Sequence, residues 1–502
     1  MRILEVIICV LLPVNLGLLA FPSKIPPDRL LYAAAIPAGV ILLHLYAEGY
    51  RWTMVPAYAL TGLVLGIVLC RNAGVGEAFF SFFSRHAGAR ITAGLLAFAF
   101  FFAAAGLPAL LPVFRLPAPP GSAAVGTAYF RFVDPRREEP ITAAPGDHRE
   151  IAVQAWYPAG PVGAARRMPY LEDAAVQGAQ LSKMLRMPAY FFNYLSRVKT
   201  HSYRDAPVAA APRKYPVLIY SHGYAFGWGG QHKVLMEALA SQGYVVLGIT
   251  HAYEGAFMYL PDGRVKYRTA GSEGQYRAVL REVGRPEWIR KIKAAAAMEN
   301  PDRQAQAMRE IVAAFPRSRQ SMMHWAADVR FLIDQIERLN ARGAWKDKLD
   351  TDRIGVIGMS FGGGAVSQAA LTDGRIKAVV DLDGAHLGDA LLGQGVPVPY
   401  LVMYSQPNEG LYDVVFNGAR QAAYRVTVAA TRHYNYSDFG LFSPLFKYVG
   451  FVGDVEAGRG LRITNDCVLL FLDKYLKNKD VPLQSLAGRY GELSIRSRNG
   501  GR

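Results

Sequence analysis

The stretch "RIGVIGMSFGGG", Arg353 to Gly364, joins a run of apolar, mostly β-branched residues to a run of glycines. Ser360 stands between Gly358 and Gly362 in the pattern Gly-x-Ser-x-Gly. The chain has 49 glycines among 502 residues, so the pattern alone arises readily by chance. The residues on either side therefore decide whether the serine has a catalytic role.

The neighbours of Ser360 predict a strand, a sharp turn and a helix. The apolar run "RIGVIGM" is typical of a buried strand, and "GGGAVSQAAL" is typical of a helix. A Gly-x-Ser-x-Gly pattern in this setting is a nucleophile elbow, whose turn leaves no room for side chains at Gly358 and Gly362. We expect Ser360 to be exposed at the start of the helix, where free N–H groups and the helix dipole stabilise negative charge.

Strand-like and helix-like runs alternate along most of the chain, which predicts a mostly parallel sheet covered by helices on both faces. With the elbow, this pattern indicates an α/β-hydrolase fold over residues 127–486. The predicted strands are "REIAVQAWYP", "YPVLIYS", "VVLGIT", "RIGVIGM", "IKAVVDLD", "VPYLVMYS" and "RVTVAA".

A nucleophilic serine needs a histidine base, which comes last in the order Ser, acid, His in this fold. Of the ten histidines, only His386 and His433 follow Ser360. His386 lies three residues beyond Asp383 on the same strand-end loop, where it is poorly placed to contact both Asp383 and Ser360. His433 follows the late strand "RVTVAA" and is the predicted base.

Three acidic residues are candidates for the third member of the triad. Asp383 ends the strand after the nucleophile helix, and Glu409 follows the next strand, which is the commoner location in this fold. Asp381 is better explained as a packed residue at the strand end. The residues alone leave Asp383 and Glu409 as alternatives.

Two backbone N–H groups are needed to hold the oxyanion. The first is expected from Phe361, directly after the nucleophile. The second is expected from Tyr224 in the glycine-rich loop "YSHGYAFGWGG", Tyr220 to Gly230. His222 and His251 precede Ser360 and are predicted to support the structure near the site.

The first 114 residues have the composition of a membrane region. Four apolar stretches approach the roughly 20 residues needed to cross a bilayer, so about four transmembrane helices are expected. A Pro/Gly-rich linker follows at residues 115–126, and residues 487–502 are predicted to form a flexible basic tail. The four stretches are Ile3 to Phe21, Leu30 to Ala47, Thr53 to Cys70 and Ile91 to Phe114.

Basic residues near these stretches predict the orientation, because cytoplasmic loops carry an excess of Lys and Arg. A cytoplasmic N-terminus leaves only Arg2 and Arg51 in the inside loops, whereas an external N-terminus leaves five basic residues there. The protein is therefore expected in the cytoplasmic membrane as a multi-pass protein, with its hydrolase domain outside the cytoplasm. If the first stretch is a cleaved signal peptide, three spans remain. The five residues are Lys24, Arg29, Arg71, Arg85 and Arg90.

Composition limits the partners. Lys and Arg exceed Asp and Glu by 16, which favours anionic surfaces. The chain has no nucleic-acid motif, so the membrane and a lipid or small ester substrate are the expected partners. Three cysteines are too few for a disulfide framework. The chain also lacks zinc-type His or Cys spacings, and no metal or cofactor is expected.

Four strings resemble the platelet-activating factor acetylhydrolase family of α/β-hydrolases. They are "YPVLIYSHGYAFGWGG", "IGMSFGGGAV", "VVDLDG" and "HYNYSDF", and they occur in that family's order. The step from Ser360 to Asp383 and the H-x-N-x-x-D-F string at His433 are specific to the family, and the resemblance favours Asp383 over Glu409. It covers roughly Gly126 to Leu476, without the apolar stretches and much of Tyr267 to Arg317.

The resemblance implies a metal-independent serine esterase or lipase acting on phospholipids with short or oxidised acyl chains. The leading hypothesis is a membrane-anchored esterase with the triad Ser360, His433 and Asp383. One alternative is an α/β-hydrolase acting on another ester class, such as a xenobiotic or polyester. Another is a membrane sensor or transporter whose hydrolase-like domain only binds ligand, although the apolar stretches contain few charges.

Overall fold

The computed structural model describes residues 2–20, 26–75, 86–142, 145–210, 213–268, 270–388 and 394–499. The chain divides into two compact units. One consists of Met1–Phe114 with the short segment Phe442–Leu445, and the other of Arg115–Leu441 with Phe446–Arg502. We call them the helical unit and the hydrolase unit.

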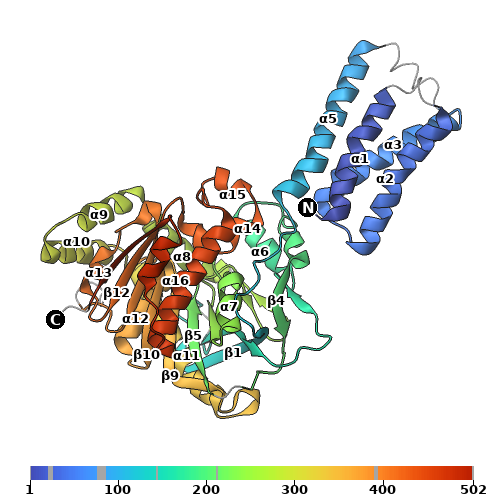
Figure 1. The fold of residues 1–502 in the computed structure, drawn as a ribbon. Coiled ribbons are helices and arrows are strands. Elements are labelled where there is room, and N and C mark those ends of the chain that lie inside the picture. Colours follow the sequence, from blue (N-terminus) through green and yellow to red (C-terminus); the bar gives the residue numbers. More distant parts are fainter. Residues whose placement is uncertain are drawn as a thin grey trace. The chain divides into compact units, whose positions relative to one another are not determined.

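The helical unit contains four long helices, coloured blue in Figure 1. They meet along a core of small and aliphatic side chains that includes Leu12, Ile41, Leu60 and Ala104. The link from Glu48 to Arg51 between the second and third helices is short enough to make a helical hairpin. The helices are α1 (Ile3–Ala20), α2 (Pro27–Ala47), α3 (Val55–Asn72) and α5 (Ala87–Leu110).

The outer faces of these helices are apolar and exposed, the reverse of the pattern in a water-soluble bundle. Large exposed side chains lie on each helix, including Val10, Tyr46, Leu63 and Phe98. Such a surface is stable in contact with lipid.

Two helical segments are long and apolar enough to cross a membrane, namely Asp28–Ala47 and Trp52–Asn72. The other two helices contain shorter apolar segments, Ile3–Pro13 and Gly94–Leu110. The expectation of about four transmembrane helices is thus met by two. The apolar segments Ile3–Pro13 and Gly94–Leu110 are shorter than the roughly 20 residues that span a bilayer core.

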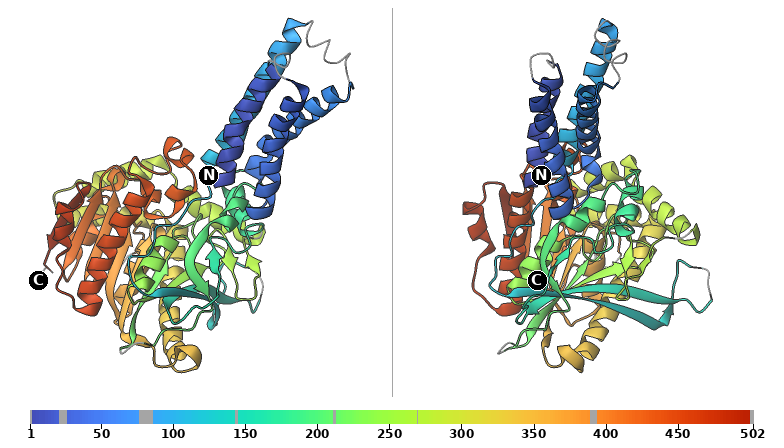
Figure 2. Two further views of the ribbon diagram at one scale, coloured as in Figure 1. Left: turned by 45° about the vertical axis from the view of Figure 1, so that its right-hand side comes forward. Right: turned by 90° about the vertical axis from the view of Figure 1, so that its right-hand side faces the viewer.

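The hydrolase unit is built on one large sheet. Within the described residues it has eleven strands in the order β13-β12-β11-β10-β9-β5-β6-β2-β1-β4-β3. The strands from β6 to β12 in this order pair in parallel, and β2 and β13 pair antiparallel to β6 and β12. In Figure 2, β1 and β2 form the long two-stranded ribbon coloured teal.

The main strands are β1 (Ala124–Glu138), β2 (His148–Ala159), β3 (Arg167–Pro169), β4 (Lys199–Arg204), β5 (Tyr215–Ser221), β6 (Val245–His251), β9 (Leu349–Met359), β10 (Ile376–Leu382), β11 (Tyr400–Ser405), β12 (Ala423–Val428) and β13 (Leu493–Arg498). The helices are α6 (Gln177–Met184), α7 (Lys233–Ser241), α8 (Ala270–Val283), α9 (Pro286–Ala296), α10 (Pro301–Ala313), α11 (Pro316–Asn340), α12 (Phe361–Thr372), α13 (Asp413–Gly418), α14 (Phe439–Phe442), α15 (Leu445–Tyr448) and α16 (Ala457–Lys477). A separate two-stranded sheet pairs β7 (Met258–Tyr259) with β8 (Val265–Lys266).

Helices cover both faces of this sheet (Figure 1). Successive strand residues point to opposite faces, and β5 shows the result. Val217 and Ile219 belong to the core that α11 and α12 complete, whereas Leu218 and Tyr220 belong to the core that α7 and α16 complete. The predicted layered architecture of a mostly parallel sheet with helices on both faces is confirmed.

Two parts of the hydrolase unit differ from the sequence-based expectation, and one segment without a structural expectation is helical. Residues Leu493–Arg498 lie in the predicted flexible tail, but they form β13 and pair with β12. Strand β1 begins at Ala124, inside the linker expected at 115–126. The segment after Tyr267 forms the helices α8, α9 and α10.

Candidate active site

Ser360 lies at a strained turn between β9 and α12. Its φ and ψ are 57° and −124°, a conformation that costs energy in a residue with a side chain. A Cβ atom on Gly358 would lie 2.2 Å from the Gly362 carbonyl oxygen, and one on Gly362 would lie 2.2 Å from that of Ser221. Both positions therefore require glycine, as expected of a nucleophile elbow.

Hydrogen bonds to the next strand fix this turn. The Ser360 N–H donates to the Leu382 carbonyl oxygen at 3.0 Å, and the Ser360 carbonyl accepts from the Ala385 N–H at 3.0 Å. The turn is thus attached to both ends of the segment that contains Asp383. The position of Ser360 relative to Asp383 is thereby set by backbone bonds.

The structure brings His433 and Asp383 together. His433 begins a short 3₁₀ turn after β12, and its Nδ1 lies 2.7 Å from Asp383 Oδ2. The histidine side chain is 31% exposed, whereas the aspartate side chain is fully buried. The amide oxygen of Asn435 holds the loop by accepting from the N–H groups of Arg432 and Gly453, each at 2.7 Å.

Asp383 is surrounded by hydrogen-bond donors. Ser405 donates through its backbone N–H at 2.9 Å and its hydroxyl at 2.8 Å, and Asn408 Nδ2 donates at 2.8 Å. Burial alone would raise the pKa of Asp383, but the bonds from His433 and Ser405 outweigh it, and the pKa lies below the ordinary value. The carboxylate is therefore ionised at neutral pH.

The other acidic candidates have different partners. Glu409 is partly exposed, and its Oε1 accepts from Arg425 Nη2 at 2.7 Å. Asp381 is buried, and its Oδ2 lies 2.7 Å from His386 Nε2 and accepts from the Tyr400 hydroxyl at 2.8 Å. Among the described residues, the carboxylate that contacts His433 is that of Asp383.

Two backbone N–H groups near Ser360 are available for an oxyanion. In the described part of the chain, neither the Phe361 N–H nor the Tyr224 N–H donates a hydrogen bond. The loop with Tyr224 approaches the nucleophile closely, since a Cβ on Gly223 would lie 3.2 Å from Ser360 Cβ. The Tyr224 and Phe361 rings are in contact, with centroids 5.2 Å apart.

His222 and His251 form a buried support beneath this loop, as the sequence predicted. His222 Nδ1 lies 2.8 Å from the Gly223 carbonyl oxygen, and His222 Nε2 accepts from the His251 N–H at 3.2 Å. His251 Nε2 lies 3.0 Å from Ser221 Oγ, and its Nδ1 lies 2.8 Å from Asp328 Oδ2. Both imidazoles are fully buried, and burial holds the pKa of each below its ordinary value.

Sequence reasoning missed the charged part of this support. Asp328 on α11 also accepts from Arg149 Nη2 at 2.7 Å and from Arg137 Nη2 at 2.8 Å. Arg149 in turn pairs with Glu139 at 3.0 Å. Arg149 stands beside Glu150 at the start of "REIAVQAWYP". This local sequence shows neither the burial of Arg149 nor its partner 179 positions away.

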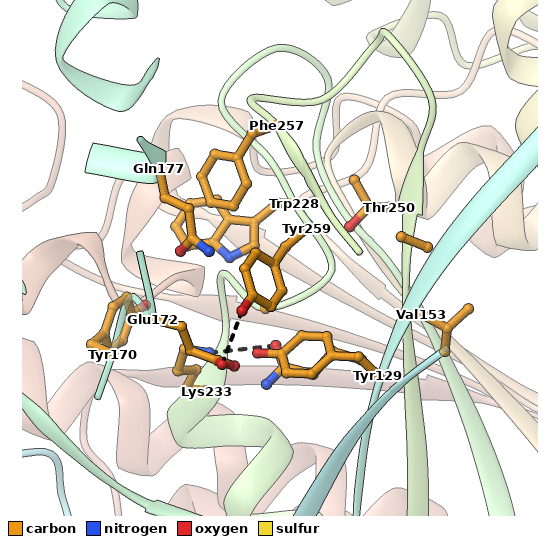
Figure 3. A pocket seen from close by; sticks show the side chains of 13 residues that line it. Tyr129, Val153, Tyr170, Glu172, Gln177, Trp228, Lys233, Thr250, Phe257 and Tyr259 are labelled. Carbon is orange, nitrogen blue, oxygen red and sulfur yellow. Dashed lines mark hydrogen bonds between the residues drawn. The ribbon is translucent and has the colours of Figure 1, made fainter. Parts of the chain in front are cut away.

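A separate small pocket lies beside the glycine-rich loop Tyr220 to Gly230, which we call the oxyanion loop after its predicted role. Trp228 and Gly230 are among the residues that line it (Figure 3). Lys233 Nζ donates to Gln154 Oε1 at 3.4 Å in it, and the Tyr259 hydroxyl donates to Glu172 at 3.2 Å. Neither Ser360 nor His433 lines this pocket. It is therefore separate from the Ser360 turn and from His433.

One group of described residues has the spacing of metal ligands, namely Glu5, His44 and Glu48 in the helical unit. Cations of the protein already neutralise these carboxylates. Arg51 Nη1 lies 2.8 Å from Glu5 Oε1, and Arg2 Nε lies 3.4 Å from Glu48 Oε2. The group is therefore better described as a network of ion pairs at one end of the helices.

The sequence model of one protein family, described as platelet-activating factor acetylhydrolase, isoform II, matches residues 174–485. The chain is 25% identical to the platelet-activating factor acetylhydrolase of Canis lupus familiaris over 317 residues, which cover 59% of this chain and 66% of that protein. It is 31% identical to a probable 1-alkyl-2-acetylglycerophosphocholine esterase of Arthroderma benhamiae over 164 residues, 28% of this chain and 42% of that protein. The chain thus spans less than two thirds of the length of these relatives.

Among solved structures, a ferulic acid esterase from Streptomyces cinnamoneus is similar, with a TM-score of 0.58 and 23% sequence identity. The match covers 76% of this chain and 99% of the esterase. At this identity the likeness shows a shared fold. It agrees with the layered architecture expected of an α/β-hydrolase.

Proposed function

The chain belongs to the platelet-activating factor acetylhydrolase isoform II family, and we propose that it is a carboxylic ester hydrolase with a Ser360–His433–Asp383 triad. The observation that carries the proposal is the 2.7 Å contact between His433 and Asp383. It joins the histidine to the carboxylate whose strand end is hydrogen-bonded to the Ser360 turn.

In the proposed reaction, Ser360 Oγ attacks the ester carbonyl carbon while His433 Nε2 takes the hydroxyl proton. Asp383 accepts the hydrogen bond from His433 Nδ1, which keeps the proton on that nitrogen and leaves Nε2 free to act as a base. The imidazolium then protonates the departing alcohol, and an acyl-serine remains. Water then attacks the acyl carbon while His433 takes its proton. The bond to Ser360 Oγ breaks, the acid leaves, and His433 returns the proton to Ser360 Oγ.

The oxyanion of each tetrahedral intermediate is assigned to the N–H groups of Phe361 and Tyr224. Two observations support this assignment. Among the described residues neither N–H group has a backbone acceptor, and the loop with Tyr224 lies close to Ser360. Backbone donors of this kind cost no reorganisation when the charge develops. Phe361 is also the first residue of α12, so the helix dipole adds to the stabilisation.

For the substrate, we propose phospholipids with short or oxidised acyl chains. The family and the relatives of dog and Arthroderma benhamiae support the short-chain part of this class, because their names describe the hydrolysis of acetyl esters. The apolar outer faces of α2 and α3 support membrane anchoring, which keeps the enzyme near lipid. The same triad acting on another class of ester is the alternative.

For the topology, we propose that all four helices cross the membrane and that the hydrolase unit lies outside the cytoplasm. This assigns five basic residues to the inside loops. If only α2 and α3 cross, the same basic residues flank the hydrolase side, and the rule places the hydrolase in the cytoplasm. Protease access to the hydrolase unit in intact cells distinguishes the two arrangements, and protection from external protease would overturn the proposal.

The enzyme proposal is tested with the full chain in detergent. A fluorophosphonate probe should label the wild type and not Ser360→Ala, and that substitution should lower turnover of a short-chain ester by about 10⁶-fold. Circular dichroism checks that the variant is folded. Labelling of Ser360→Ala, or turnover within tenfold of the wild type, would refute the assignment, and an unlabelled wild type would favour a non-catalytic sensor.

A further inference from the structure

Helix α8 lies in the segment after Tyr267, which the resemblance to the family does not cover. It places a tyrosine, Tyr276, against the oxyanion loop. The Tyr276 ring stacks on the Tyr224 ring, with centroids 5.9 Å apart and planes inclined by 13°. Tyr224 in turn contacts the Phe361 ring at 5.2 Å. Three aromatic rings thus run from the residue after Ser360 to α8, and Tyr276 is the half-buried outer member.

Tyr276 is held from a second side by Arg268. The guanidinium carbon of Arg268 lies 3.7 Å from the centre of the Tyr276 ring, a close cation–π contact. Arg268 is itself fixed, because Nη1 donates to the Gly255 carbonyl oxygen at 2.6 Å. The Tyr224 hydroxyl is bonded to Glu254 at 3.4 Å. Both neighbours of the Tyr276 ring are therefore anchored to the loop after β6.

Tyr276 also acts electrostatically on a side chain next to the proposed base. Burial raises the pKa of Tyr434 to about 12, and the neighbouring phenol of Tyr276 contributes. Tyr434 follows His433, and their rings are 5.3 Å apart. The ring contact of Tyr276, however, is with Tyr224 in the loop of the proposed oxyanion donor.

The helix that carries Tyr276 is attached firmly to α11. Glu282, near its end, accepts from the Ser318 N–H at 2.8 Å and the Ser318 hydroxyl at 2.7 Å, which caps the first turn of α11. Val279 is completely buried. Helix α11 also supplies Trp325, whose ring packs on Phe361 at 4.9 Å. Tyr276 is therefore part of a fixed wall.

We propose that Tyr276 limits the length of the acyl group that the site accepts. This inference rests on the proposed function. The leaving alcohol must face His433, which protonates it, so the acyl chain extends from the same carbon past the oxyanion donors. Those donors are the backbones of Phe361 and Tyr224, and Tyr276 stacks on the Tyr224 ring beside them. A short acyl group fits in front of this wall, and a long one meets it.

The test varies the acyl chain and keeps the leaving group constant. The full chain in detergent is assayed with p-nitrophenyl acetate, butyrate and octanoate, for the wild type, Tyr276→Ala and Tyr276→Phe. In the wild type, kcat/KM should fall from acetate to octanoate. Tyr276→Ala should raise the octanoate-to-acetate ratio of kcat/KM at least about tenfold, since pocket size discriminates by factors of this order. Tyr276→Phe keeps the ring and should leave the ratio within about twofold of the wild type.

Arg277→Ala is the matched control, because Arg277 is the exposed next residue of α8 and its side chain is ion-paired to Glu273 at 2.9 Å. It should not change the ratio. An unchanged ratio in Tyr276→Ala would overturn the inference, as would an equal loss of activity on all three esters, which indicates that Tyr276 only braces Tyr224. A wild type that hydrolyses none of the esters would instead refute the proposed function, and the inference with it.

Discussion

Two histidine–aspartate pairs of the hydrolase unit look alike at their contact. His433 Nδ1 lies 2.7 Å from Asp383 Oδ2, and His251 Nδ1 lies 2.8 Å from Asp328 Oδ2. Ser221 Oγ lies 3.0 Å from His251 Nε2, and Ser360 is the serine that we propose to act with His433. Hydrogen-bond distance alone does not distinguish a reactive arrangement from a supporting one.

The surroundings of the two pairs differ. The His433 side chain is 31% exposed, and the donors around Asp383 other than His433 are neutral groups. His251 is fully buried and stacked on Trp325 at 3.9 Å, and Asp328 faces two arginines. The histidine of the first pair is open to solvent. The second pair is closed to it, so its contribution is to the stability and shape of the loop above it.

The largest expected effect comes from the acid of the exposed pair. Asp383→Asn should lower kcat on a soluble short-chain ester by about 10⁴-fold, because an amide stabilises the wrong imidazole tautomer. Glu409→Gln is the control, since Glu409 bonds to Arg425, and its kcat should stay within about tenfold of the wild type. If Glu409→Gln is the inactive variant and Asp383→Asn stays active, the acid is Glu409.

The buried pair should matter for stability. Asp328→Asn leaves the buried Arg149 with one carboxylate fewer, and breaking a buried ion pair costs about 3–5 kcal/mol of unfolding free energy. Asp383→Asn should cost only about 1 kcal/mol, because it exchanges hydrogen bonds without stranding a charge. Denaturant unfolding in detergent, followed by circular dichroism, measures both. Equal losses would contradict the distinction between the pairs.

The sequence was sufficient for features encoded locally. Ser360 lies in a motif whose glycines are required by contacts of 2.2 Å, and His433 was selected by chain order after the last strands. The seven predicted strands all appear, because each contains a local run or alternation of apolar residues. The edge strand β13 was missed because its basic, alternating sequence resembles a solvated tail, which is also how edge strands avoid aggregation.

Features that depend on distant contacts could not be derived in this way. The residues alone left Asp383 and Glu409 as alternatives, because the choice depends on where the loop of His433 returns to the sheet. The Arg149–Asp328 pair joins positions 179 residues apart. The contact of Tyr276 with Tyr224 depends on how α8 packs, and no periodicity in "AGSEGQYRAVLREV" indicates that packing.

The last expected effect is a pH dependence of stability that arises in the buried pair. Burial lowers the pKa of His251 to about 4, although the bond to Asp328 partly opposes the shift. Between about pH 6.5, where histidine titrates in the unfolded chain, and pH 4, the unfolded chain binds a proton that the folded chain does not. The unfolding free energy should therefore fall as pH is lowered through this window, by about 3 kcal/mol for this one group. His251→Gln removes the titrating group and should make the decline shallower, whereas His148→Gln, at an exposed position, should not. Unfolding midpoints at half-unit pH steps measure the slope. A wild type whose stability is constant from pH 6.5 to pH 4 would show that the imidazole beneath the oxyanion loop accepts protons as readily as an exposed one, and the contrast between the two pairs would then rest on access alone.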